Sequence, residues 1–414
     1  MQDNEKKPAL RFKGFTDPWE QRKLGDAFER VVRKNTNNES RLPLTISAQD
    51  GLVDQITYFN NRVASRDVSN YYLVYNGEFA YNKSTSDGYP FGAVKRLDWY
   101  EKGVLSTLYI VFALKHPEKD DSDFMTVFYD TDRWHRGVAE RAAEGARNHG
   151  LLNISADDFF DIDTTMPEDK VEQEKIGRLL KKLDTLITLH QRKYEKLVNI
   201  KKSMLDKMFP KNGASVPEIR FKGFTDPWEQ RKLGEIAKEV VRNDPASDAP
   251  IMMITAGNGF IEQSDRYAFN NAGESLKKYI LLERGELAYN HGASKLRPYG
   301  SCFALTTVEK ARIPFVYHCF SVEKSNPEFL SIELNGANVE NQLRKIVSSG
   351  ARMDGLLNIA YSEYTEVTVQ LPKKEEQDWI AKFFKHLDTL ITLHQRKLEK
   401  LQNIKKSCLE KMFV

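Results

Sequence analysis

Apolar residues recur at alternating spacings of four and three over two stretches of the chain, and each stretch follows a long segment without this period. Such a seam repeats every 3.5 residues, which is typical of an α-helical coiled coil. Its positions are Leu183, Ile187, His190, Tyr194, Leu197, Lys201, Met204 and Met208 in the first stretch, and Leu387, Ile391, His394, Leu398, Leu401, Lys405, Cys408 and Met412 in the second. Pro167 and Pro372 precede the stretches and acidic residues follow each proline, which favours a helix start at both places. The sequence therefore predicts two helices of about 40 residues, each about 60 Å long at about 1.5 Å per residue.

The long segments before the helices contain short runs of β-branched and aromatic residues between Gly, Asn and Asp, which is the pattern of strands. The expected strands are Leu42–Ser47, Tyr71–Asn82, Val104–Leu114 and Asp123–Tyr129 in the first segment, and Pro250–Thr255, Lys278–Asn290, Ser301–Val308 and Pro314–Val322 in the second. Short helices are expected over Thr131–Glu144 and Pro327–Val347. Each segment is predicted to be an α+β domain with a curved, mostly antiparallel sheet.

The order of elements is duplicated, and four phrases occur twice. They are RFKGFTDPWEQRKLG (Arg11–Gly25 and Arg220–Gly234), (N/R)GE(F/L)AYN (Asn76–Asn82 and Arg284–Asn290), GAR…GLLNI (Gly145–Ile154 and Gly350–Ile359) and LDTLITLHQRK (Leu183–Lys193 and Leu387–Lys397). The offsets of the first and last phrases, 209 and 204, are nearly equal. The chain is therefore two copies of one unit of roughly 200 residues, a size typical of domains. Between these phrases the two copies differ almost completely, as expected of one scaffold that carries unlike loops.

The expected organisation is a domain at 1–166, a spacer helix at 167–209, a second domain at 210–371 and a second helix at 372–414. If the two seams pair antiparallel, the helices separate the domains, which are then related by a pseudo-two-fold axis. His190 and His394 lie near the middle of their helices and should then approach each other. We interpret them as polar residues that set the register of the seam, with a metal site or pH switch as the alternative.

The net charge of +3 hides an uneven distribution of charge. Residues 1–169 hold 22 Lys and Arg against 28 Asp and Glu, whereas residues 170–211 hold 12 against 5. Residues 212–372 hold 18 against 20, and residues 373–414 hold 10 against 6. The helices thus carry the basic excess, so an anion bound by the mildly acidic domains must be met by local basic loops.

Composition favours a cytoplasmic protein without a membrane span. The chain has no apolar run long enough to cross a bilayer and no signal peptide at its start. Its cysteines, Cys302, Cys319 and Cys408, do not form a disulfide framework and lack the CxxC spacing of a zinc site. We therefore expect free, buried thiols and no metal site.

Motifs of catalysis are also absent from the sequence. It contains no GxxxxGK[ST] phosphate loop, no HExxH and no GxSxG elbow. The Asp/Asn-Pro-Pro-aromatic run of adenine methyltransferases is absent too. The acidic stretches Glu118–Asp123 and Asp157–Asp163 have no counterpart in the other copy, so we interpret them as solvated loops. The chain is expected to bind a target and to have no catalytic residues of its own.

The order of domain, long helix, domain and long helix resembles the specificity subunit of Type I restriction-modification systems, as found in low-GC Gram-positive bacteria. WEQRKLG, GE(F/L)AYN, GAR…GLLNI and LDTLITLHQRK…KLxNIKKSxLxKMF carry the resemblance, which covers nearly all 414 residues. It implies two target-recognition domains that each read one half of a split double-stranded DNA site. It also implies that the helices set the gap between the halves, and a 60 Å spacer spans roughly 15–18 base pairs at ~3.4 Å each.

The resemblance further implies partners and their cofactors. Two methyltransferase subunits would dock on the helices and bring S-adenosylmethionine to modify adenine. Separate translocase–nuclease subunits, with ATP and Mg, would join them for cleavage. The chain itself would contribute specificity, bind no cofactor and catalyse nothing. The alternative is an assembly scaffold that holds two protein partners and no DNA, which the net negative charge of both domains supports.

Reading DNA requires polar, basic and aromatic side chains on loops that a rigid sheet presents. In each domain the best candidate is the loop after the repeated AYN strand, and the turn after the first strand is a second candidate. The loop candidates are Lys83, Ser84, Ser86, Tyr89, Lys95 and Arg96 in the first domain, and His291, Ser294, Lys295, Arg297 and Tyr299 in the second. Gln49 and Asn258 are the turn candidates, and Arg147 and Arg352 in the GAR phrase are candidates for holding phosphate. Ordinary polar loops, tight turns and structural packing are the respective alternatives.

The identical phrases suggest two equivalent surfaces for docking one partner twice. The candidates are Trp19 and Trp228 in the opening phrase, and Lys193, Lys196, Lys201, Lys202, Lys397, Lys400, Lys405 and Lys406 on the helices. For the tryptophans we favour the alternative, a structural contact between each domain and the helices.

Overall fold

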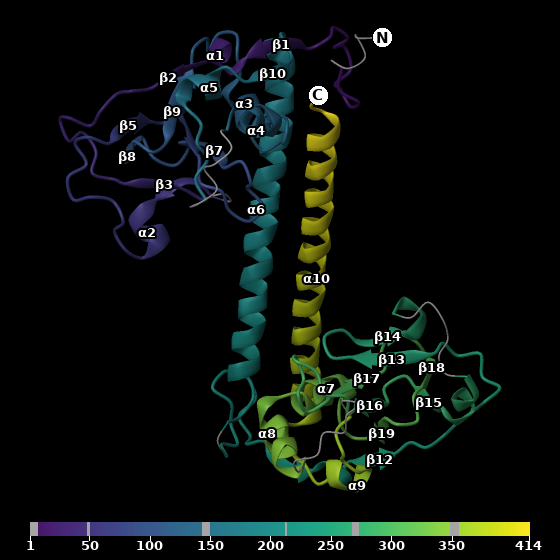
Figure 1. Cartoon of the computed structure of the whole chain (residues 1–414). Helices are drawn as coiled ribbons and strands as arrows, with labels where there is room; N and C mark the ends of the chain where they lie inside the picture. Colours follow the sequence, from purple (N-terminus) through teal and green to yellow (C-terminus); the bar gives the residue numbers. More distant parts are fainter. Residues whose placement is uncertain (1–6, 48–49, 143–149, 212, 267–272, 348–355) are drawn as a thin grey trace. The chain divides into compact units, whose positions relative to one another are not determined.

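The computed structural model of the chain describes residues 7–47, 50–142, 150–211, 213–266, 273–347 and 356–414 (Figure 1). The chain divides into two units, Met1–Arg192 with Gln395–Val414, and Lys193–His394. Helix α6 (Lys170–Lys207) and helix α10 (Lys374–Lys411) each contribute one part to each unit. The two long helices that the apolar seam predicts are thus confirmed.

The first unit contains a domain of short strands and helices followed by the first part of α6. Its elements are β1 (Glu20–Lys23), α1 (Leu24–Ala27), β2 (Phe28–Arg30), β3 (Leu44–Ser47), β4 (Gly51–Asp54), α2 (Gln55–Phe59), β5 (Tyr72–Tyr75), β6 (Phe79–Asn82), β7 (Ala93–Arg96), β8 (Lys102–Leu105), β9 (Ile110–Leu114), α3 (Ser122–Phe128), α4 (His135–Arg141), α5 (Ala156–Phe160) and β10 (Asp163–Met166). A four-stranded sheet in the order β2-β9-β6-β7 is accompanied by the pairs β1-β10, β3-β4 and β5-β8. All these pairs of strands are antiparallel.

The second unit repeats this topology. Its elements are β11 (Glu229–Lys232), β12 (Ala237–Glu239), β13 (Met252–Thr255), β14 (Gly259–Glu262), β15 (Ile280–Glu283), β16 (Leu287–Asn290), β17 (Ser301–Ala304), β18 (Lys310–Ile313), β19 (His318–Val322), α7 (Pro327–Leu334), α8 (Ala337–Ile346), α9 (Tyr361–Tyr364) and β20 (Thr368–Leu371), with 3-10 turns at Leu233–Glu235, Gln263–Asp265 and Gly273–Lys278. The sheet order β12-β19-β16-β17, with pairs β11-β20, β13-β14 and β15-β18, matches the first unit strand for strand. The predicted pair of similar α+β domains with antiparallel sheets is confirmed.

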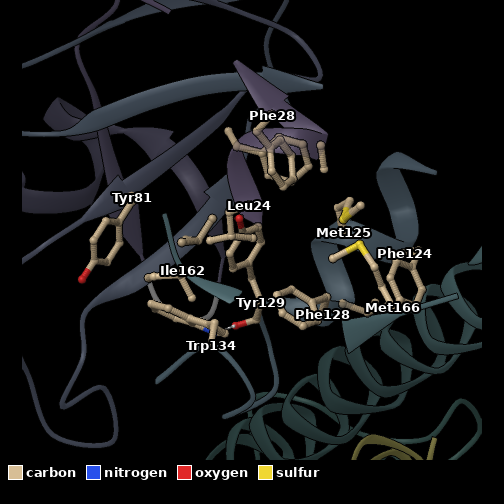
Figure 2. Close-up of a cluster of buried hydrophobic side chains, with 14 of the residues drawn as sticks. Leu24, Phe28, Tyr81, Phe124, Met125, Phe128, Tyr129, Trp134, Ile162 and Met166 are labelled. Atoms are coloured by element: carbon tan, nitrogen blue, oxygen red, sulfur yellow. Dashed lines mark hydrogen bonds between the residues drawn. The ribbon is translucent and has the colours of Figure 1, made fainter. Parts of the chain in front are cut away.

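The core of the first unit is rich in aromatic side chains (Figure 2). Phe28 and Phe79 pack against Phe112 on the sheet, with ring centroids 4.9 and 5.6 Å from that of Phe112. Phe124 and Phe128 of α3 are fully buried in the same cluster, together with Ile176 and Leu180 of α6. Helix α3 therefore joins the sheet to the long helix.

The expectation of a strand at Asp123–Tyr129 was wrong, because this segment forms α3. β-branched and aromatic residues favoured a strand, yet Phe124, Val127 and Phe128 also have the i, i+3, i+4 spacing of a buried helical face. Asp121 supplies the deciding local signal, since its carboxylate accepts a hydrogen bond from the backbone N–H of Phe124 and caps the helix. Asn326 caps α7 in the same way, by accepting from Phe329 N.

The repeated opening phrase fastens each domain to the start of the helix that follows it. The guanidinium of Arg11 binds both carboxylate oxygens of Glu172 at 2.6 and 2.8 Å, and Arg220 binds Glu376 at 2.7 Å through both oxygens. Both glutamates are fully buried, so each charge depends on its bidentate arginine. This contact gives a structural reason why the arginine of the phrase is the same in both copies.

The end of each long helix docks on a domain through an aromatic residue. In the first unit Phe413, just after α10, packs against Trp19, with 6.1 Å between ring centroids, and against Phe124, with 5.5 Å. In the second unit Phe209, just after α6, packs against Trp228 and Phe329, with 5.8 Å between centroids in both cases. Both tryptophans are buried, so they are packing residues and not a surface for an external partner.

The two helices pair antiparallel within each unit. In the first unit Lys405, late in α10, binds Asp184, early in α6, at 2.7 Å. In the second unit Lys201, late in α6, binds Asp388, early in α10. The lysines of the predicted seam thus have carboxylate partners on the neighbouring helix. His190 and His394 belong to different units, so their mutual approach stays a prediction.

Glu333 of α7 is a buried carboxyl group in the core of the second unit. Its Oε1 accepts a hydrogen bond of 3.0 Å from the backbone N–H of Gln370. Burial raises the pKa of Glu333 to about 7, and the hydrogen bonds from Gln370 and Asn338 offset only part of this rise. In the first unit Phe128 lies at the matching position, seven residues after the helix cap.

Candidate nucleic-acid interface

The AYN strand and the GLLNI phrase are neighbours in both domains. In the first domain Leu152 N donates to the backbone oxygen of Lys83 at 3.0 Å, and Lys83 Nζ donates to Ile154 O at 3.3 Å. In the second domain Leu357 N donates to His291 O at 2.9 Å, and His291 Nδ1 lies 2.9 Å from Leu357 O. The two sequence phrases thus form one shared structure, which holds the first residue of the candidate loop.

His318 adds a second contact to this structure in the second domain. Its Nε2 lies 2.9 Å from the oxygen of Ile359, so this nitrogen carries the proton. Burial lowers the pKa of His318, and the ring is therefore neutral near pH 7. Lys83 of the first domain makes the equivalent contact with Ile154, so a lysine side chain there replaces the imidazole.

The loops between the strands, residues 83–91 and 291–299, have equal length and are anchored alike. Tyr81 donates its hydroxyl to Phe91 O at 2.8 Å, and Tyr289 donates to Tyr299 O at 2.7 Å. Burial raises the pKa of both tyrosines, so both hydroxyls remain protonated donors. Tyr299 itself packs against the core, which gives it an anchoring role in the structure.

A glycine closes each loop against the strand on which it began. Gly92 has a φ of +77°, and a Cβ at this position would lie 2.1 Å from the backbone oxygen of Asn82. Gly300 has a φ of +80°, and its Cβ would lie 2.6 Å from Asn290 O. Only glycine fits this close approach, so both domains present a loop of the same shape at the same place.

The tips of the loops differ in chemistry. In the first domain Ser86 and Tyr89 bond to each other through their backbones, and Ser84 and Ser86 are exposed. In the second domain Ser294 and Lys295 are exposed at the tip. Tyr89 is half-buried at the position that Arg297 takes in the second domain. The two tips therefore present different side chains to solvent.

Three of the basic candidates are engaged within the domains. Lys95 binds Asp130 at 2.9 Å, and Arg96 binds Asp98 and Asp123 at 2.6 and 2.8 Å. Arg297 donates to the backbone oxygen of Asn335 at 2.7 Å, and burial lowers its pKa. These contacts give the three side chains a structural role, so we leave them out of the DNA-contact surface proposed below.

The second candidate turn lies beside the loop in the second domain. Asn290 donates its side-chain amide to Ile254 O at 3.2 Å, and a Cβ on Gly257 would lie 3.7 Å from the side chain of Leu296. Asn258 is exposed in this turn. The structure thus brings Asn258 together with the loop that carries Ser294 and Lys295. Gln49, Arg147 and Arg352 lie outside the described residues.

The sequence analysis missed an exposed aromatic element in the first domain, helix α2, which follows the hairpin of β3 and β4. None of the five side chains of α2 is buried, and Tyr58 and Phe59 are half exposed with 5.0 Å between their ring centroids. Trp99 is 68% exposed and donates its indole N–H to the oxygen of Asp50 in the hairpin turn. The sequence did contain a signal for this element, because Tyr-Phe-Asn-Asn at 58–61 is repeated in similar form as Tyr-Ala-Phe-Asn-Asn at 267–271.

Other features bear on the class of protein. Among the described residues, no group of three or more His, Cys, Asp or Glu side chains is placed to hold a metal ion. No helix in the described part of the chain is long and apolar enough to cross a membrane.

Comparison with known proteins gives a likeness of fold. No family model matches the sequence. The structure is similar to that of the Type I restriction-modification system S subunit from M. genitalium, with a TM-score of 0.56 and 13% sequence identity, over 99% of both chains. It is also similar to the HsdS subunit from Thermoanaerobacter tengcongensis, with a TM-score of 0.41 and 14% identity over 95% of this chain and 96% of that chain. A chain from a structure on complex assembly and conformational transition of the type I R-M system gives the same score and identity, over 95% and 97%. The resemblance stated from the repeated phrases is thereby confirmed as a shared fold.

Proposed function

We propose that this chain is the DNA sequence-specificity subunit of a Type I restriction-modification complex, in which each domain reads one half of a bipartite target. One observation carries the proposal: both domains hold a loop of equal length on the same tyrosine and glycine anchors, and the exposed side chains of the two loops differ. A reader of two unlike half-sites needs this combination of constant support and variable tip. The fold shared with the M. genitalium S subunit supports it.

The contact surface that we propose is smaller than the set of residues chosen from sequence. It consists of the exposed loop and turn residues Ser84, Ser86, Asn258, Ser294 and Lys295, with Lys83, His291 and Tyr89 behind the tips. Gln49, Arg147 and Arg352 remain proposed contacts, of which the two arginines would hold phosphate. The exposed aromatic side chains of Tyr58, Phe59 and Trp99 extend this surface in the first domain.

The long helices are proposed to set the gap between the half-sites and to dock two methyltransferase subunits. Their exposed lysines supply the docking face, namely Lys193, Lys196, Lys202, Lys397, Lys400 and Lys406. Lys201 and Lys405 are excluded from it, because they pair with carboxylates inside the units. S-adenosylmethionine belongs to the methyltransferase subunits, and ATP with Mg to the translocase–nuclease subunits, in this proposal.

Exchange of one domain tests the proposal. Replacing residues 30–165 by those of another family member is expected to change one half of the methylated sequence and to leave the other half as it was. Methylome sequencing of cells that carry the exchanged chain with its partners reads both halves at once. A change in both halves, or in neither, contradicts independent reading by the two domains.

A gel-shift experiment separates DNA binding from the scaffold alternative. The complex is expected to bind a bipartite duplex with an affinity that falls with salt, at a log–log slope of about 0.9 for each neutralised phosphate. Random duplexes of equal length are the control. Binding of partner proteins without any DNA affinity favours a scaffold that joins two proteins.

A further inference from the structure

Four charged side chains form a continuous ionic chain in the first unit. Lys95 Nζ lies 2.9 Å from one oxygen of Asp130, and Lys405 Nζ lies 3.1 Å from the other. Lys405 also binds Asp184 at 2.7 Å. These residues belong to β7, the segment after α3, α10 and α6 in turn. This network of ion pairs therefore connects β7, the strand after the candidate loop, to both long helices.

Three residues of this ion-pair network are largely buried. The side chains of Lys95, Asp130 and Lys405 are 17%, 21% and 19% exposed. Although burial acts to raise the pKa of Asp130, the two lysines hold it below its ordinary value of 3.8. Loss of Asp130 leaves the side chains of Lys95 and Lys405 without the carboxylate that they share. A partly buried network of this kind fixes geometry better than an exposed pair does.

In the second unit the equivalent lysine links the two helices, and a separate ion pair, Lys385 with Glu328, joins α10 to α7 of the domain. Its Lys201 binds Asp388, as Lys405 binds Asp184. The position of Asp130, nine residues after the helix cap, is taken by Asn335, which bonds to the backbone N and O of Cys302 in β17. Phe303 takes the place of Lys95, opposite the alanine of the AYN strand. Asn335 thus holds the strand of its own domain, whereas Asp130 in the first unit is ion-paired with a lysine of a long helix.

We propose that Asp130 and Lys405 are positioning residues that fix the first domain on the helix pair and thereby determine which gap length the protein accepts. The inference rests on the proposed function. Adjacent base pairs are about 3.4 Å apart along the duplex, so accepting a gap one pair longer or shorter requires the contact loop to move by roughly that distance. The ion pair between Asp130 of the domain and Lys405 of α10, supported by Lys95 on one side and Asp184 on the other, resists such a movement.

The test measures gap tolerance in the assembled complex. The full chain with its methyltransferase subunits is given duplexes that carry the recognised half-sites with the native gap, and with gaps one and two base pairs longer or shorter. The variant Asp130→Asn, which introduces the residue found in the second unit, is expected to raise methylation at gaps of plus and minus one by about tenfold relative to wild type. The bases recognised in both half-sites should stay the same.

Matched variants separate positioning from loss of fold. Asp161→Asn removes carboxylate contacts to Lys23 and Arg141 in the same domain, none of which belongs to a long helix, and should keep the wild-type gap preference. Lys405→Met is expected to relax the gap as Asp130→Asn does, and the double variant should add nothing further. Lys405→Arg keeps the charge and should keep the gap.

The outcomes are distinguishable from a failure of the proposed function. A wild-type complex that methylates no bipartite site overturns that function, and this inference with it. A wild-type complex that methylates one gap length, together with Asp130→Asn and Lys405→Met complexes that keep the same preference, overturns the positioning role alone. Lower melting temperature without gap relaxation also counts against the proposal, because it shows a purely structural contact.

Discussion

Phe413→Ala is expected to lower the free energy of unfolding of the first unit by about 4 kcal/mol, as is usual when a buried aromatic ring is removed. Phe413 is 3% exposed, and its ring centroid lies 6.1 Å from that of Trp19 and 5.5 Å from that of Phe124. The alanine leaves a cavity between the domain and the end of α10. It therefore removes both apolar contact and the anchor of this helix end.

Hydrogen exchange followed by mass spectrometry checks this result unit by unit. Amides of α3 and of the last turns of α10 should exchange faster in the variant, whereas those of α7 should keep their rates. Phe209→Ala is the matched variant, because Phe209 packs on Trp228 and Phe329, and it should show the reverse pattern. Unchanged exchange in α3 of the Phe413 variant contradicts the prediction.

Glu333→Gln is expected to stabilise the second unit at pH 8 by about 3 kcal/mol, since one unit of pKa shift is worth about 1.4 kcal/mol. The folded pKa of about 7 lies above the ordinary value of 4.5. Below that ordinary value Glu333 is protonated in both the folded and the unfolded state, so its burial carries no penalty for ionisation. Between the ordinary value and about pH 7, the carboxyl group of Glu333 ionises in the unfolded chain but stays protonated in the folded one. The free energy of unfolding therefore falls over this range and stays low above pH 7.

Glutamine imitates the protonated carboxyl group and still accepts from Gln370 N, so it removes the penalty without removing the acceptor. The measurement is the difference in unfolding free energy between variant and wild type in urea at pH 4, 6 and 8. It should grow from near zero to its full value over this range. A Glu333→Gln difference that is independent of pH would refute the assignment.

The sequence was most informative where contacts are periodic or repeated. The seam of spacings of four and three predicted both long helices, because a helix pair buries the same face turn after turn. The repeated phrases likewise predicted two similar domains, and the structure explains the repetition through contacts such as Arg11 with Glu172 and Arg220 with Glu376. These features depend on local or duplicated chemistry, which a single sequence displays.

The candidate site was predicted less well, because the partners of its basic residues lie far away along the chain. Lys95 and Arg96 follow the loop in sequence and are natural choices for phosphate. Lys95 pairs with Asp130, 35 residues further on, and Arg96 pairs with Asp123, 27 residues further on, as well as with its near neighbour Asp98. Only the fold brings the distant carboxylates to these side chains. The helix α3 was mistaken for a strand for a related reason, since burial on several sides makes a short helix as apolar as a strand.

The docking of the two helix ends has a consequence for how such a chain is built. Each half of the sequence carries a tail, Met208–Phe209 or Met412–Phe413, and a socket around Trp19 or Trp228 that receives the tail of the other half. Because both tails have the sequence Lys-Met-Phe, the tail of either half should also fit the apolar site around the tryptophan of its own type of half. Two copies of one half are therefore expected to close on each other as a homodimer. Under the proposed function, such a homodimer would recognise a site with two identical halves, and fusion of two divergent copies would allow the halves to differ.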